Sequence, residues 1–306
     1  MPAFITAEGE RAARRFLEFF TVNIRNRNTR KAYAAAVVCF FDWCSARRLT
    51  LAYVQPVHVA TYIEQLQTRS SKQTVKQHLA AIRALFDWLV VGQIVPGNPA
   101  LSVRGLRYST IKGKTSVLNA AEARELLNSI DTSSVVGLRD RALIALMTYT
   151  FARVGAVVSM KVNAYYPQTK RWWVRLQEKN GKLNEMPCHH NLEQYLDHYI
   201  EAAAITNDKT APLFRTALGK THKLTDKPMR QADVYRMIQR RAEQAGIQTK
   251  IGCHTFRATG ITAYLKNGGK LEIAQQMAGH SNPKTTSLYD RRNDQISMDE
   301  VERILI

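Results

Sequence analysis

Four side chains near the C-terminal end of the sequence could together act on a phosphate group: His254, Arg257, His280 and Tyr289. His254 and Arg257 are three positions apart, so on a helix they would share one face. Donors of this kind suit phosphate oxygens, because charge-assisted hydrogen bonds are the strong ones. The Tyr289 hydroxyl can attack phosphorus, but with a phenol pKa of about 10 it needs a base or a positive field. These residue types could therefore bind a phosphate group and supply a hydroxyl to attack it.

Each feature alone has a simpler explanation, since His-x-x-Arg occurs on many surface helices and a single Tyr is more often a core residue. The ordered set from Cys253 to Arg292, however, resembles the C-terminal signature of the tyrosine recombinase (phage integrase) family. That signature is His-x-x-Arg, then Gly-His, then the nucleophilic Tyr nine positions later. The resemblance implies a DNA strand transferase.

A further arginine, Arg153, lies in a strongly apolar segment at 137–162. A buried Arg must be paired or must face a ligand, and a structural ion pair is the alternative to a catalytic role. The resemblance implies that Arg153 is the first catalytic Arg. The family's acidic residue three positions later is Ala156 here, so another, unidentified group must orient the guanidinium.

The sequence predicts a hairpin with strands at 171–176 and 183–187 around the turn Asn180-Gly181. Two lysines, Lys179 and Lys182, stand on either side of that turn. The family's catalytic Lys sits in a similar hairpin. The alignment favours Lys179, with Lys182 as the alternative.

The resemblance implies a mechanism without metal or nucleotide cofactor. Tyr289 attacks a backbone phosphate, forms a 3′-phosphotyrosyl bond and releases a 5′-hydroxyl, and the kept bond energy lets another 5′-hydroxyl religate the strand without ATP. Positive groups stabilise the transition state, while a base and an acid move the protons. The expected catalytic residues are Arg153 and Arg257 for charge, His254 as base, Lys179 as acid, His280 on a non-bridging oxygen, and Tyr289.

The charge of the chain fits a polyanion ligand. The 306 residues include 44 Lys and Arg against 25 Asp and Glu, a net +19 with a pI near 10.0. Residues 1–110 hold 15 of the basic and 6 of the acidic residues, so both parts of the chain are basic. This favours a clamp that holds a duplex from two sides, although a merely basic soluble protein is the alternative. Candidate DNA contacts are Arg30, Lys31, Lys72, Lys76, Arg83, Arg104, Arg107, Lys182, Arg236 and Arg240.

The periodicity predicts two domains. Helical patterns begin near residue 8, after Asn28-Thr29, at Pro56 and after a capping box at Ser70 and Gln73, which makes an all-α domain at 1–95. Residues 96–114 lack periodicity and predict a basic linker. Residues 115–306 form the expected catalytic domain. The fold class is therefore mainly α with a small antiparallel β-sheet, and the resemblance implies a C-shaped clamp of a core-binding and a catalytic domain.

Within the catalytic part, Asn119 and Glu122 predict a capping box, helices are expected at 190–204 and 230–247, and 217–227 is predicted as a mobile basic loop. Residues 295–306 predict an apolar-faced helix that must dock, either on its own domain or on a neighbouring protomer.

The expected partner is double-stranded DNA with inverted-repeat core sites, bound as a dimer per site and a tetramer in synapsis. Alternatives are a type IB topoisomerase and a catalytically silent DNA-binding regulator. Four dispersed Cys, the absence of an ~18-residue apolar run and the lack of a signal-peptide core predict the bacterial cytoplasm and no membrane contact. The run Cys188-His189-His190 lacks the second cluster that a zinc site needs.

Overall fold

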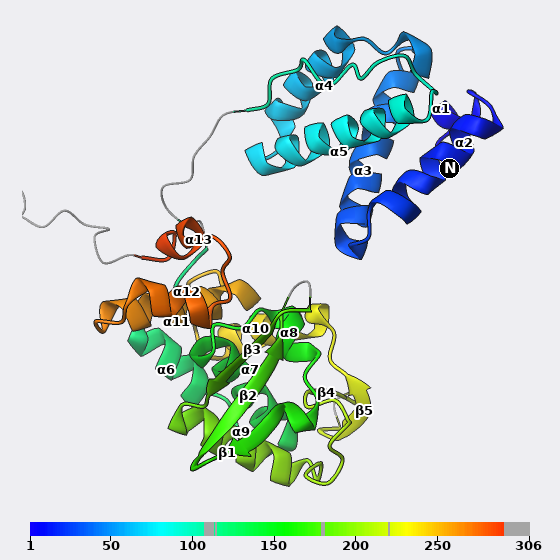
Figure 1. Cartoon of the computed structure of the whole chain (residues 1–306). Helices are drawn as coiled ribbons and strands as arrows, with labels where there is room; N and C mark the ends of the chain where they lie inside the picture. The colour runs from blue at the N-terminus through cyan, green and yellow to red at the C-terminus, as the bar shows by residue number, and fades with distance from the viewer. Residues whose placement is uncertain (107–112, 114, 179–180, 220, 291–306) are drawn as a thin grey trace, which may run out of the picture. The chain divides into compact units, whose positions relative to one another are not determined.

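The computed structural model describes residues 1–106, 113, 115–178, 181–219 and 221–290 (Figure 1). The chain divides into two compact units, Met1–Ser109 and Thr110–Ile306. Within the described parts, no helix is both long enough and apolar enough to cross a bilayer.

The first unit is all-helical, as predicted. Its core is aromatic: Phe40, Phe41, Tyr62 and Phe86 are each at most 1% exposed. Phe40 lies edge-on to Tyr62 with the ring centroids 5.1 Å apart, a favourable arrangement for two aromatic quadrupoles. The elements are α1 (Ala3–Thr6), α2 (Glu10–Glu18), the π-helical turn η1 (Phe19–Asn23), α3 (Arg27–Ser45), the 3₁₀ turn η2 (Leu51–Tyr53), α4 (Pro56–Arg69) and α5 (Lys72–Val91).

Two helix starts differ from the prediction. The N-cap of α3 is Asn26, not Asn28-Thr29, because the Asn26 side chain accepts hydrogen bonds from the amides two and three positions later. The N-cap of α5 is Ser71, whose hydroxyl accepts from the Thr74 amide, so the capping box predicted at Ser70 is wrong. In both cases neighbouring Asn or Ser residues offer equivalent caps, and only the backbone path selects one.

Part of the segment predicted as linker packs on the first unit. Val95, Ala100 and Val103 are buried in its core. Arg83 on α5 donates to the carbonyl oxygens of Ala100 and Val103, which satisfies backbone groups outside regular structure. The first unit thus extends beyond residue 95, and where a linker begins and ends stays a prediction.

The second unit is built around the buried helix α7, which packs against α9 and α11. Its helices are α6 (Ala120–Asn128), α7 (Val135–Tyr149), α8 (Val154–Val158), α9 (His190–Ala202), α10 (Gln231–Gln244), α11 (Cys253–Lys266), α12 (Leu271–Met277) and α13 (Pro283–Ser287), with a 3₁₀ turn η3 (Val162–Ala164). The predicted capping box of α6 is present, with Asn119 and Glu122 bonded reciprocally.

The small antiparallel sheet predicted for this unit has three strands in the order β1-β2-β3: β1 (Tyr165–Gln168), β2 (Arg171–Gln177) and β3 (Leu183–Pro187). β2 and β3 are the predicted hairpin, with Val174 opposite Met186. β1, which the sequence did not predict, pairs with β2. The predicted loop at 217–227 is instead mostly a second hairpin, because β4 (Arg215–Ala217) pairs with β5 (Leu224–Pro228).

Helix α11 lies against α7 because Gly260 leaves no side chain at the contact. A Cβ at Gly260 would lie 2.0 Å from the Thr148 carbonyl oxygen and 2.8 Å from the Phe151 ring. This approach brings the N-terminal half of α11 beside the turn that follows α7. That turn passes through Phe151, which has a φ of 56° and redirects the chain into α8.

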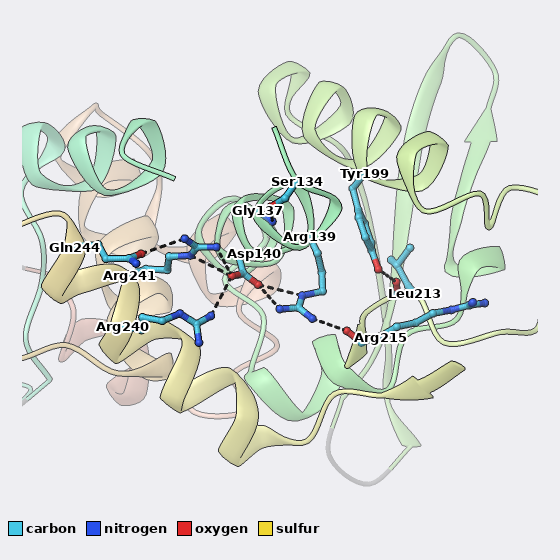
Figure 2. A network of polar contacts seen from close by, with 10 residues as sticks. All are labelled: Ser134, Gly137, Arg139, Asp140, Tyr199, Leu213, Arg215, Arg240, Arg241 and Gln244. Carbon is cyan, nitrogen blue, oxygen red and sulfur yellow. Dashed lines mark hydrogen bonds and ion pairs between the residues drawn. The ribbon is translucent and has the colours of Figure 1, made fainter. Parts of the chain in front are cut away.

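A buried ion cluster ties α7 to α10 (Figure 2). Asp140 on α7 has no exposed surface and accepts two hydrogen bonds each from Arg139 and Arg241. Arg240 lies 3.5 Å from the same carboxylate, and Arg139 also donates to the carbonyl oxygen of Arg215, the first residue of β4. One buried carboxylate is thus the shared partner of the arginines that join α7, α10 and β4, as buried charge requires.

Candidate active site

Five of the predicted catalytic residues lie together in the second unit. They come from four places in the chain that the packing of α11 on α7 assembles. Arg153 is the N-cap residue of α8, His254 and Arg257 lie in the first turns of α11, His280 follows α12, and Tyr289 follows α13.

Arg257 is the centre of the cluster and has no exposed surface. Its guanidinium donates to the Phe151 carbonyl oxygen, to the Ala278 carbonyl oxygen at 2.6 Å, and to the His280 ring at 2.6 Å. Burial, and then the positive charge of Arg153, lowers the pKa of Arg257 to about 10, which keeps it protonated near neutral pH. The guanidinium is therefore a charged donor held in one orientation by the backbone.

His280 is held from both ring nitrogens. Gly279, with a φ of 59°, ends α12 in the left-handed region and turns the chain so that the His280 amide bonds back to the Gln275 carbonyl oxygen. Arg257 can only donate, so His280 Nε2 must accept, and Nδ1–H must donate to the Thr286 hydroxyl at 2.8 Å. Burial and the two neighbouring arginines lower the pKa of His280 to about 3, so the ring is neutral.

Tyr289 lies beside His254 in the same chain. The Tyr289 hydroxyl is 2.6 Å from His254 Nε2, and the tyrosine is only 7% exposed. Thr262 on α11 donates to the Tyr289 carbonyl oxygen at 3.0 Å and anchors its backbone. Burial raises the pKa of the Tyr289 phenol, and the charges of Arg257 and Arg153 act against that rise.

His254 sits at the edge of the cluster, and as a residue it is exposed. Partial desolvation of its ring, followed by the charges of Arg257 and Arg153, lowers the pKa of His254. The ring is therefore neutral near pH 7 and can accept the phenolic proton.

Arg153 is paired with a residue that the sequence reasoning missed. Its guanidinium donates to Glu178 Oε2 at 2.5 Å, and Glu178 follows the last residue of β2. The Glu178 side chain is 3% exposed, whereas that of Arg153 is 38% exposed. The sequence offered one signal for this partner. The expected acidic residue is missing at Ala156, and the carboxylate of Glu178 stands next to the candidate Lys179.

The comparisons with known proteins decide the family. Residues 116–295 match the family described as "Phage integrase family", and residues 13–94 match "Phage integrase, N-terminal SAM-like domain". The chain belongs to the phage integrase family. As predicted, it is a site-specific tyrosine recombinase, a DNA breaking-rejoining enzyme.

Individual relatives of this phage integrase family member are distant in sequence. Tyrosine recombinase XerD of Ralstonia nicotianae is 28% identical over 86% of this chain and 83% of its own length. The structure of XerH recombinase bound to a palindromic difH substrate matches with a TM-score of 0.72 at 20% identity, over 90% of this chain and 79% of that one. A lambda integrase tetramer on a Holliday junction matches with a TM-score of 0.70 at 16% identity, over 93% and 79%. These structures confirm the fold.

The remaining predicted residues are Lys179 and the candidate DNA contacts, and they lie outside the cluster around Arg257 or outside the described residues. Lys179 and Arg107 lie outside the described residues. Arg30 is bonded within the first unit, since it donates twice to the Ile24 carbonyl oxygen, and Arg83 is occupied by carbonyl groups as described above. These contacts occupy Nε and Nη2 of each guanidinium, and a DNA contact of Arg30 or Arg83 stays a prediction. The exposed candidates are Lys31, Lys72, Lys76, Arg104, Lys182, Arg236 and Arg240.

Proposed function

We propose that this recombinase cleaves DNA with Tyr289 as the nucleophile. The observation that carries the proposal is the 2.6 Å contact between the Tyr289 hydroxyl and His254 Nε2, beside the buried Arg257. A neutral imidazole at that distance can take the phenolic proton as the Tyr Oη–P bond forms.

The transition state carries more negative charge than the phosphodiester, and Arg153 and Arg257 supply fixed positive charge for it. His280 is held neutral with its Nδ1–H on Thr286 and its Nε2 accepting from Arg257, so in this arrangement its part is to orient Arg257. Its proposed contact with a non-bridging oxygen requires the other tautomer, with the proton on Nε2, once DNA is bound. Because Arg257 has no exposed surface, residues that cover it must move before a phosphate can reach it. The site therefore opens when DNA binds.

The leaving group needs a proton as the P–O5′ bond breaks, and Lys179 is the proposed donor. The products are a 3′-phosphotyrosine and a free 5′-hydroxyl, and the reverse step with a new 5′-hydroxyl joins strands. No metal or nucleotide enters this balance.

DNA contacts on the second unit are proposed for α10. A cleft of about 620 Å³ beside this helix is lined by four arginines: Arg139, Arg236, Arg240 and Arg241. Arg139 and Arg241 are held by Asp140, whereas the side chains of Arg236 and Arg240 are 72% and 52% exposed and can reach phosphates. We assign Arg236 and Arg240 to backbone contact rather than to base recognition.

Two copies on an inverted-repeat site and four in synapsis are the proposed assembly. The XerH substrate is palindromic and the lambda integrase assembly is a tetramer, and a two-fold symmetric site fits two copies of one chain. The tail helix predicted at 295–306 lies outside the described residues, so its docking in cis or in trans stays open. The proposed location is the bacterial cytoplasm.

Tyr289→Phe tests the proposed function. The variant should bind DNA as well as the unaltered protein and form no denaturant-resistant DNA adduct, because only the phenolic oxygen is removed. Tyr264→Phe, at a tyrosine on α11 that contacts the same local core, is the matched control and should keep the adduct. An adduct that persists in Tyr289→Phe would exclude this residue as the nucleophile.

A further inference from the structure

We infer that Glu178 is the positioning residue for Arg153, in place of the carboxylate that the position of Ala156 lacks. The inference rests on the proposed function, because it concerns how one arginine of that site is oriented. Glu178 lies 25 positions after Arg153 in the chain, and only the return of β2 toward α8 brings the two side chains together.

The exposed fractions of the two side chains indicate that Glu178 positions Arg153, and not the reverse. Glu178 is almost fully enclosed, so its carboxylate has lost its water and must be compensated by protein. Arg153 is the one ion-pair partner that the described residues supply. The Arg153 guanidinium keeps more than a third of its side-chain surface exposed, so it can bind Glu178 on one side and a phosphate on the other.

The surroundings of Glu178 place it inside the active site rather than on a structural periphery. Its Cγ lies 3.8 Å from the position that a Cβ of Gly279 would occupy, so its stem runs beside the loop that carries His280. The negative charge of Glu178 also acts on Arg257, since it raises the pKa of that guanidinium against the effect of burial. Glu178 is thus paired with Arg153 and close enough for its charge to act on Arg257.

The second carboxylate oxygen, Oε1, is buried and has no hydrogen-bond partner among the described residues. A buried acceptor of this kind is costly unless some state of the molecule satisfies it. A second guanidinium N–H from Arg153 would do so and would make the pair bidentate, the geometry that best fixes an arginine plane.

The position of Glu178 also links Arg153 to the hairpin of β2 and β3. The Glu178 amide donates to the Lys182 carbonyl oxygen at 2.7 Å and so closes the base of the hairpin that includes Lys179. One residue therefore joins the hairpin by its backbone and Arg153 by its side chain. A shift of the hairpin at Glu178 would therefore move Arg153 with it.

Glu178→Gln tests this inference in the full-length chain. The substitution keeps the shape of the side chain and removes its charge, so folding and DNA affinity should stay close to those of the unaltered protein. Cleavage should slow by about tenfold to a hundredfold, the range expected for a lost hydrogen bond between charged groups. Glu185→Gln is the matched control: Glu185 also pairs with an arginine on the same sheet, but that pair is exposed and outside the cluster, so cleavage should not change.

A substrate with a scissile methylphosphonate separates positioning from a general structural defect. The methyl group replaces a charged non-bridging oxygen, so the transition state depends less on a well-placed arginine. The Glu178→Gln defect should therefore be smaller on this substrate than on ordinary DNA. An equal defect on both substrates, or ordinary DNA cleaved by Glu178→Gln within twofold of the unaltered rate, would overturn the inference. The proposed function fails separately, if the unaltered protein forms no adduct.

Discussion

Removal of Asp140 should destabilise the second unit more than the loss of any exposed acidic residue. Asp140 has no exposed surface and is the counter-ion of Arg139 and Arg241, whose side chains are 4% and 12% exposed (Figure 2). In Asp140→Ala both guanidinium groups stay buried and lose their partner. Breaking a buried pair in this way costs about 3–5 kcal/mol. Arg240 adds little to this figure, because its side chain is 52% exposed.

Thermal unfolding of the full chain measures the effect. For a unit of this size, 1 kcal/mol corresponds to about 2–4 °C in Tm, so the transition of the second unit should fall by about 6–20 °C. The difference should persist at high salt, because buried charges are screened much less than exposed ones. Asp226→Ala is the control, since Asp226 pairs with Arg215 at 99% side-chain exposure and should contribute about 0–1 kcal/mol. A Tm for Asp140→Ala within about 2 °C of the control would refute the reasoning.

Three further predictions concern the site. The pKa of His280 is about 3 in the folded chain and about 6.5 in the unfolded chain. Its contribution to the free energy of unfolding is therefore complete above pH 6.5 and falls at lower pH, where only the unfolded chain takes up the proton. Urea unfolding should show a loss of about 2 kcal/mol by pH 5, and the His280→Gln variant should not show this loss. Thr286→Val should slow cleavage by about threefold to tenfold through loss of the hydrogen bond to His280, and Thr286→Ser should restore the rate. Lys179→Ala should impair cleavage of ordinary DNA but not of a substrate with a 5′-bridging sulfur, because a thiolate leaves without an acid; the same rescue in Lys182→Ala instead would move the role to Lys182.

Local features of the fold were accessible from the sequence. The β2-β3 hairpin followed from Asn180-Gly181, and the start of α4 followed from Pro56. Caps were placed less well, since Asn26 and Ser71 have neighbours of equal capping ability. Strand β1 was missed because its Tyr-Tyr-Pro-Gln sequence has no alternation, and only pairing with β2 makes it a strand.

The amino-acid sequence by itself was enough to predict the family and to select the candidate reacting groups. His254 and Arg257 share a helix turn, and Gly279, His280 and Tyr289 follow at short sequence separations. The motif can therefore be recognised from the spacing of its residues along the chain. Such spacing reflects local geometry, which a sequence displays directly.

Only the tertiary structure decided how those groups are held. Glu178 meets Arg153 because β2 returns to the start of α8, and Asp140 meets Arg241 because α10 packs on α7. Neither pair has a spacing that distinguishes it from any other carboxylate and arginine. The physical reason is burial: a charge taken out of water must find a partner, and the chain's packing, not its order, determines which partner is near.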